Sequence, residues 1–289
     1  MGRGAPAVAG RDAGKRNVLG VLVDAVDYAA VTERVLVAAR ERRPLALTAL
    51  AVHGVMTGVR DPAYAALLNG LDIVTPDGQP VRWALNLLHG VGLDDWVSGP
   101  ELTLRVLRAM AAEGLPVYVY GSTPRTVAKL AEALPRLVPG VRIAGAEPSR
   151  FRHAAPGEEV ALARRIVDSG ARLVLVGLGC PRQEMFVAGM RPLVDVPLLA
   201  VGAAFDYHAG RLRPAPRWVQ RSGGAWLWRL AQEPRRLWRR YLLNGGFLLR
   251  LAAPDGGRGG PPSAQPGRPR GPGGPVCGPV GVLGRFGNC

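Results

Sequence analysis

The feature that most constrains the fold of this chain is a regular alternation of short apolar runs with longer helical patterns. Strand, helix and strand at this spacing are typical of βαβ units, whose parallel sheet is buried on both faces. We therefore predict an α/β fold with a mostly parallel sheet flanked by helices. The expected strands lie at 45–50, 71–75, 116–121, 141–147, 171–179 and 196–205, and the expected helices at 29–41, 54–69, 99–113, 123–136, 157–169 and 182–190.

The two ends of the chain differ in composition from this core. Residues 1–16 are small, polar and basic, which predicts a flexible N-terminal arm. Residues 253–289 are rich in Gly and Pro without a collagen period, a composition that cannot repay its ordering entropy and predicts a disordered tail. We expect the core over 17–208 and a basic helical appendage over 209–252, interrupted or kinked at Pro234.

The charge of the chain indicates an anionic partner. Its 37 Lys and Arg against 22 Asp and Glu give a net charge of +15, which fits nucleic acid, an anionic membrane or a phosphorylated substrate alike. No apolar run reaches the length of a spanning helix and the first residues lack an apolar signal segment, so any membrane contact is expected to be peripheral. Three scattered cysteines predict neither a disulfide scaffold nor a zinc cluster and fit a reducing cytoplasm.

Polar or glycine-rich residues follow several of the expected strands. Ligands of open parallel sheets bind beyond the carboxyl ends of the strands, so these residues are expected to share one edge. The segments 120–130 and 176–184 each read as a strand, a glycine turn and a helix start, which suits an anion such as diphosphate but also describes any tight βα turn. Neither is a full G-x-G-x-x-G, so hydride transfer gains little support. The candidates at these exits are Thr48, Asp77, Gly121, Gln183 and Asp206.

Asp77 has two interpretations from its residues alone. In TPDGQPV it can form a β-turn, which the Asp-Gly and Pro residues favour, or it can be a fixed carboxylate that takes a proton from an acceptor hydroxyl. Asp206 can likewise cap a turn or bind a sugar or ribose hydroxyl. The chain has no D-x-D or H-E-x-x-H motif and its four histidines are dispersed, so we expect no metal site.

The stretch 206–252 interleaves basic with aromatic and aliphatic residues. It holds ten arginines, two acidic residues and four of the six tryptophans. Such a segment suits the surface of an anionic bilayer. A helix docked on the core with solvated arginines and an RNA-binding face are the alternatives, although no recognisable nucleic-acid module is present.

The order of these motifs resembles the WecG/TagA/CpsF family of bacterial glycosyltransferases over about Val18 to Leu251. VGLGCPRQE (176–184) is similar to the family's V-x-L-G-x-P-[KR]-Q-E, and 201–242 is similar to its G-x-x-F-D-x-x-A-G-x-x-x-R-A-P-x-W and E-W-x-x-R-L-x-x-E-P-x-R-L-x-R-R-Y blocks. The D-G pair at Asp77 and the glycine turn at Gly121 also match.

The resemblance implies an enzyme with a Rossmann-like fold. It would transfer an N-acetylhexosamine, typically N-acetylmannosamine, from a UDP-sugar to an undecaprenyl-diphosphate-linked sugar in the synthesis of cell-envelope polysaccharide or teichoic acid. The implied reaction is inverting and independent of metals and cofactors. The appendage would meet the anionic inner face of the cell membrane, so the protein would be cytoplasmic and peripheral; family members can also self-associate.

The resemblance also implies roles for individual residues. Asp77 would be the general base that deprotonates the attacking acceptor hydroxyl. Thr48 would line the sugar-diphosphate pocket, and Gly121 would cradle the nucleotide. Gln183 and Asp206 would hold donor hydroxyls or the uridine.

Three arginines of the appendage complete the implied site, and two positions depart from the family pattern. Arg229, Arg236 and Arg239 would neutralise the diphosphate of donor or acceptor. The family's T-x-N ends here in Leu50, and Trp96 stands where an Arg is usual. The alternative function, from a different class, is a non-catalytic module that binds anionic lipid or RNA through the appendage.

Overall fold

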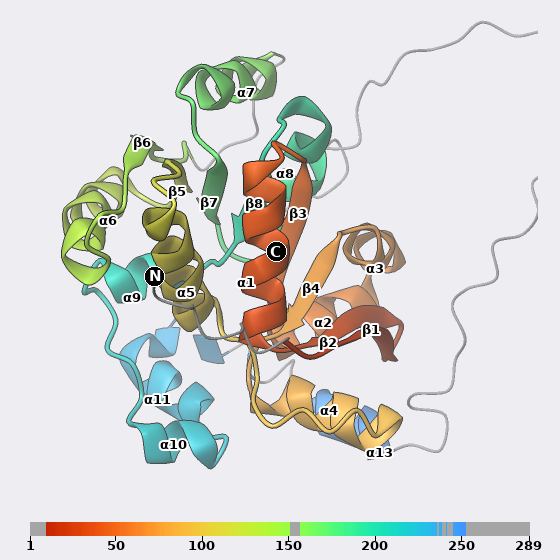
Figure 1. The fold of residues 1–289 in the computed structure, drawn as a ribbon. Coiled ribbons are helices and arrows are strands. Elements are labelled where there is room, and N and C mark those ends of the chain that lie inside the picture. Colours follow the sequence, from red (N-terminus) through yellow and green to blue (C-terminus); the bar gives the residue numbers. More distant parts are fainter. Residues whose placement is uncertain (1–9, 151–156, 236, 239–240, 242–244, 253–289) are drawn as a thin grey trace, which may run out of the picture.

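A six-stranded sheet forms the centre of the computed structural model, which describes residues 10–150, 157–235, 237–238, 241 and 245–252 (Figure 1). All neighbouring strands in it are parallel, which confirms the predicted α/β class. The strands, in the spatial order β4-β3-β8-β7-β5-β6, are β3 (Leu45–Leu50), β4 (Ile73–Pro76), β5 (Val117–Gly121), β6 (Ile143–Glu147), β7 (Leu173–Gly177) and β8 (Pro197–Ala200).

Helices cover both faces of the sheet. Alternate strand residues point to opposite sides, so Leu173 and Leu175 enter one core cluster while Val174 and Val176 enter the other. The first cluster lies under α1 (Tyr28–Arg40), α5 (Gly99–Ala112), α6 (Pro124–Leu137) and α9 (Ala204–His208). The second lies under α2 (Val52–Arg60), α3 (Pro62–Asn69), α4 (Gln79–His89), α7 (Glu158–Asp168), α8 (Arg182–Met190) and α13 (Gly246–Ala252).

A two-stranded hairpin corrects the prediction of a flexible arm up to residue 16. β1 (Asp12–Val18) pairs antiparallel with β2 (Val21–Val26), and β2 lies beside β4. The buried carboxylate of Asp24 accepts a hydrogen bond from the Val74 N–H at 2.7 Å, which satisfies a backbone group at this side of the sheet. β1 lacks a sequence signal because Val18 is its single buried residue. Residues 1–9 of the predicted arm lie outside the described residues.

Two of the expected elements differ from the observed ones by more than two residues. The helix predicted over 54–69 is broken at Asp61, which ends α2 and accepts hydrogen bonds from Ala63 and Tyr64 to begin α3. Pro62 takes the first position of α3, where its missing N–H costs nothing. The strand predicted over 196–205 ends at Ala200, because α9 begins at Ala204.

The C-terminal segment returns to the core. α11 (Ala225–Gln232) ends before Pro234, in line with the predicted interruption, and α10 (Arg217–Arg221) precedes it. Leu237 and Phe247 are each 1% exposed, and Phe247 joins the core cluster that contains Met56 and Leu85. No helix in the described ranges is long and apolar enough to cross a bilayer. The tail predicted over 253–289 falls outside the described residues.

The docking of α13 gives a direct test of this fold. Phe247→Ala should lower the free energy of unfolding by about 3–5 kcal/mol, because it removes a buried aromatic ring and leaves a cavity. Its neighbour Leu249 is 77% exposed, so Leu249→Ala should change this free energy by less than about 0.5 kcal/mol. Guanidinium titration of both variants measures the difference; equal small effects would show that α13 is not part of the core.

Candidate active site

The carboxyl ends of five neighbouring strands meet at one edge of the sheet. Leu50 pairs with Pro76, so β3 and β4 end level, and β8 ends at Ala200 opposite Thr48, two residues earlier along β3. The last residues of β5 and β7, Gly121 and Gly177, also face each other. The residues predicted from the strand exits therefore converge on this edge.

Asp77 directly follows β4 and is held against β3. Its N–H donates to the carbonyl of Leu50 at 3.1 Å, and Gly78, with φ of 90°, turns the chain into α4. The N–H of Val97 donates to the Pro76 carbonyl at 2.9 Å, which brings the segment before α5 across the end of β4. Asp77 is thus a half-buried residue in a turn, and the turn places its carboxylate at the strand edge.

Two tyrosines lie within electrostatic range of Asp77. Burial raises the pKa of Tyr28 to about 12, and the charge of Asp77 adds to this shift. The Tyr28 hydroxyl contacts Ser98 Oγ at 3.1 Å and accepts from the Ser98 N–H at 2.9 Å. Burial also raises the pKa of Tyr207 on α9, where Asp77 again adds to the shift. Sequence reasoning missed both tyrosines because neither follows a strand directly.

Arg229 approaches the same edge from α11. Its guanidinium lies 5.7 Å from the centre of the Tyr207 ring and 3.5 Å from the carboxylate of Glu233. Tyr207 therefore has the positive charge of Arg229 and the negative charge of Asp77 in its surroundings. The other two predicted arginines, Arg236 and Arg239, lie outside the described residues.

Gly121 occupies a position that admits no side chain. Its φ is 122°, and a Cβ would lie 2.7 Å from the carbonyl oxygen of Gly177. The next N–H, of Ser122, donates to that oxygen at 2.8 Å, and Thr123 caps α6 through the N–H of Thr126 at 3.2 Å. The tight βα turn is present, and its use as a nucleotide cradle stays a prediction.

Asp206 faces the start of α6 through an arginine that sequence reasoning missed. Arg211 Nη1 donates to Asp206 Oδ1 at 3.1 Å and to Thr126 Oγ1 at 2.7 Å. The Asp206 carbonyl also accepts from the N–H groups of Arg211 and Leu212. The backbone of Asp206 therefore closes a turn while its carboxylate holds the Arg211 guanidinium at the start of α6, and its predicted contact with a sugar or ribose hydroxyl stays a prediction.

Thr48 and Gln183 meet at a buried acid. Thr48 Oγ1 and Gln183 Nε2 both donate to Glu184 Oε1, each at 2.8 Å. All three side chains are buried. Gln183 also abuts the β8–α9 loop, where a Cβ on Gly202 would lie 2.9 Å from Gln183 Oε1. The sequence motif contained Glu184 but gave no reason to assign it a role.

Leu50 brings an apolar side chain to the end of β3. It is buried, and a Cβ on Gly54 would lie 2.2 Å from its Cδ1, so the side chain fills the space over the first turn of α2. Cys180 is half-buried, with its Sγ 3.4 Å from the Tyr64 hydroxyl. Leu50, which stands where the family pattern has Asn, is therefore packed against α2.

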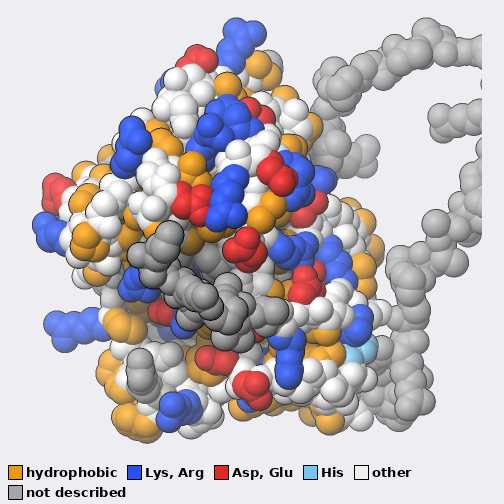
Figure 2. Space-filling view, viewed as in Figure 1, with side chains coloured by type: hydrophobic (Ala, Val, Ile, Leu, Met, Phe, Trp, Pro, Cys, Tyr) orange, Lys and Arg blue, Asp and Glu red, His pale blue; other side chains and the backbone are white. Residues whose placement is uncertain are grey.

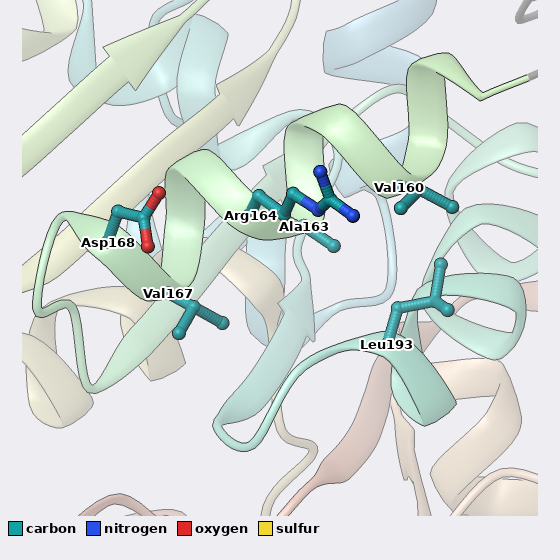
Figure 3. Close-up of a pocket in the computed structure, with 6 residues that line it drawn as sticks. All are labelled: Val160, Ala163, Arg164, Val167, Asp168 and Leu193. Atoms are coloured by element: carbon teal, nitrogen blue, oxygen red, sulfur yellow. The ribbon is translucent and has the colours of Figure 1, made fainter.

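A shallow groove elsewhere on the surface does not coincide with this edge. It has a volume of about 280 Å³ and lies between α7 and the short helix η1 (Arg191–Leu193), as Figure 3 shows. η1 precedes the amino end of β8, whereas Gly202 follows its carboxyl end. Its lining residues are Val160, Ala163, Arg164, Val167, Asp168 and Leu193.

The charges of the molecule are mixed rather than segregated on the face that Figure 2 shows, where basic and acidic side chains alternate over the surface. Within the described ranges, no group of three His, Cys, Asp or Glu side chains is placed to hold a metal ion. The candidate site therefore consists of Asp77 with its neighbouring tyrosines, the arginines Arg211 and Arg229, the glycine turn and the cluster around Glu184.

Comparison with known protein families agrees with this arrangement. Residues 16–256 match the model of the glycosyl transferase WecG/TagA/CpsF family. The match begins within β1 and covers β2, the whole six-stranded sheet and the described C-terminal helices. The match includes every candidate residue described above, at the strand ends and in the C-terminal segment. The chain therefore belongs to the WecG/TagA/CpsF family of glycosyltransferases.

Proposed function

We propose that this glycosyltransferase moves an N-acetylhexosamine, with N-acetylmannosamine as the first donor to test, from UDP to an undecaprenyl-diphosphate-linked sugar. The product would enter a cell-envelope polysaccharide or teichoic acid. The observation that carries the proposal is the position of Asp77. Asp77 is half-buried, and the hydrogen bond from its backbone N–H to Leu50 holds it at the strand edge where ligands of parallel sheets bind.

The proposed reaction is a single displacement that inverts the anomeric carbon. The acceptor hydroxyl oxygen attacks that carbon from the side opposite UDP while its proton passes to Asp77. A C–O bond to the acceptor forms, the bond to the β-phosphate oxygen breaks, and UDP leaves with the electron pair. Asp77 suits the role of base because the backbone fixes its place before substrate binds.

Cationic side chains would stabilise the departing diphosphate. Arg229 contacts the ring of Tyr207, which is also within electrostatic range of Asp77. Arg211 lies at the start of α6, where it donates to Thr126. The N-terminal end of α6 adds the partial positive charge of its helix dipole. We propose that these groups, together with Arg236 and Arg239, absorb the charge without a metal ion.

We also propose that the protein works peripherally, at the inner face of the cell membrane. Several large apolar side chains of the C-terminal segment are exposed, which is unfavourable in water and suits a lipid interface. Figure 1 draws α4, α10, α11 and α13 at the same lower end of the molecule. The exposed side chains are Trp218, Trp226, Leu227, Trp228, Trp238, Leu248 and Leu249.

The same apolar side chains would also serve the alternative, a module that binds anionic lipid without transferring sugar. Calorimetry with UDP separates the two functions. The proposed transferase binds UDP, whereas a lipid-binding module has no reason to do so.

Asp77→Asn should reduce turnover by about 10²–10⁴-fold and leave UDP affinity nearly unchanged, because an amide cannot accept the proton of the acceptor hydroxyl. Turnover is measured as transfer from UDP-N-acetylmannosamine, and from other UDP-sugars, to a lipid-diphosphate acceptor. Asp94→Asn is the matched control, since Asp94 is an exposed acid on the loop before α5. Wild-type turnover in Asp77→Asn would remove the base role, and no transfer by the wild type from any donor would refute the function.

The double variant Leu248→Ser and Leu249→Ser should weaken binding to vesicles that contain anionic phosphatidylglycerol by about tenfold or more, because two aliphatic side chains can no longer enter the interface. Val160→Ser is the control, since Val160 is an exposed apolar residue on α7. Vesicle co-sedimentation measures both. Unchanged binding by the double variant would exclude α13 from the membrane contact.

A further inference from the structure

Glu184 is a carboxylate with no exposed surface, in the first turn of α8. The N-terminal end of a helix favours a negative charge, which offsets part of the cost of burying it. Burying a carboxylate still lowers the stability of the fold, so the contacts of Glu184 indicate which role offsets that loss.

Two side chains, Thr48 and Gln183, donate hydrogen bonds to Glu184, and the hydroxyl of Tyr64 on α3 also interacts with its carboxylate. Thr48 reaches it from β3 and Gln183 from α8, and both donate to the same oxygen, Oε1, at 2.8 Å. The other oxygen, Oε2, and the amide oxygen of Gln183 accept no hydrogen bond from any residue in the described part of the chain. Burial raises the pKa of the nearby Tyr64 hydroxyl, and the charge of Glu184 adds to that shift.

Asp24, the other buried acid among the described residues, shows a different pattern. Its Oδ2 accepts the N–H of Val74 at 2.7 Å, and its Oδ1 lies 3.8 Å from the guanidinium of Arg34. Those contacts are what a structural acid needs, namely a backbone group to satisfy and a cation to pair with. The neighbours of Glu184 are instead neutral side chains, and two of them, Thr48 and Gln183, are the residues expected to meet the donor.

We propose that Glu184 is a positioning residue for the sugar donor, which fixes the side chains of Thr48 and Gln183 through its shared oxygen. This inference rests on the proposed function. The hydrogen bonds select one rotamer for each side chain before the donor arrives, so less conformational entropy is lost on binding. Glu184 Oε2 and Gln183 Oε1 are buried acceptors without a hydrogen bond, which is unfavourable for folding and is commonly found at functional sites.

A double-mutant cycle on donor KM tests the proposal. Glu184→Leu removes the acceptor at similar volume, and Thr48→Val removes the hydroxyl donor without changing the shape. We expect Thr48→Val to raise the donor KM about tenfold and Glu184→Leu to raise it by at least as much, because Glu184→Leu also releases Gln183. The double variant should raise KM no further than Glu184→Leu alone, because the interaction that Thr48→Val removes is already lost in it. Glu184→Gln keeps an acceptor oxygen and should restore KM to within about threefold of wild type.

Asp24→Asn is the matched control for loss of a buried charge. It should lower the melting temperature while the donor KM stays at the wild-type value, because Asp24 contacts the backbone of β4 and no candidate residue. If Glu184→Leu does not fold, the cycle is run with Glu184→Gln, whose smaller rise in KM should disappear in the Thr48→Val background.

The outcomes separate the two proposals. A wild type that transfers no sugar refutes the proposed function and the positioning role with it. An active wild type for which Glu184→Leu leaves KM unchanged, or for which the double variant raises KM by the product of the two single effects, refutes the positioning role alone. A melting temperature that falls in Glu184→Leu while KM stays constant would likewise identify Glu184 as a structural acid.

Discussion

The parallel pairing of β3 with both β4 and β8 determines which residues lie together at the candidate site. The pairing levels Leu50 with Pro76 and Thr48 with Ala200, so Asp77 and the β8–α9 loop emerge at the same edge, within about two residues of each other along β3. Because strand side chains alternate between faces, a shift of one residue would turn Thr48 away from α8 and separate it from Glu184. The chemistry at the edge thus depends on a register that the apolar residues of β3 fix.

The sequence carried enough information to locate this edge. Apolar runs between helical patterns predicted the six strands of the sheet. Asp77 and Gly121 became candidate site residues because they lie at the ends of two of these runs. The strands could be predicted because burial on both faces demands continuous apolar runs. The positions of Asp77 and Gly121 at the edge follow from the strand ends, and their roles stay predictions. The hairpin escaped notice since β1 is polar and half-buried, and the break at Asp61 was hidden within one apolar periodicity.

The residues that sequence reasoning missed share a physical cause. Arg211, Tyr207 and Glu184 contact residues that are far away along the chain, and no local pattern encodes such contacts. Glu184 stood inside a recognised motif, but a first-turn acid of a helix has a sufficient local explanation in the helix dipole. Only the three-dimensional arrangement shows that its oxygen joins β3 to α8.

The C-terminal segment is attached to the body at both of its ends. Arg211 bonds to Asp206 and Thr126 at the beginning, while Phe247 enters the core near the end. A segment attached at two places cannot swing away from the body as a loop with one attachment could. Because Leu237 is also buried, Arg229 on α11 lies between fixed points, and these limit how far its guanidinium can shift along the strand edge.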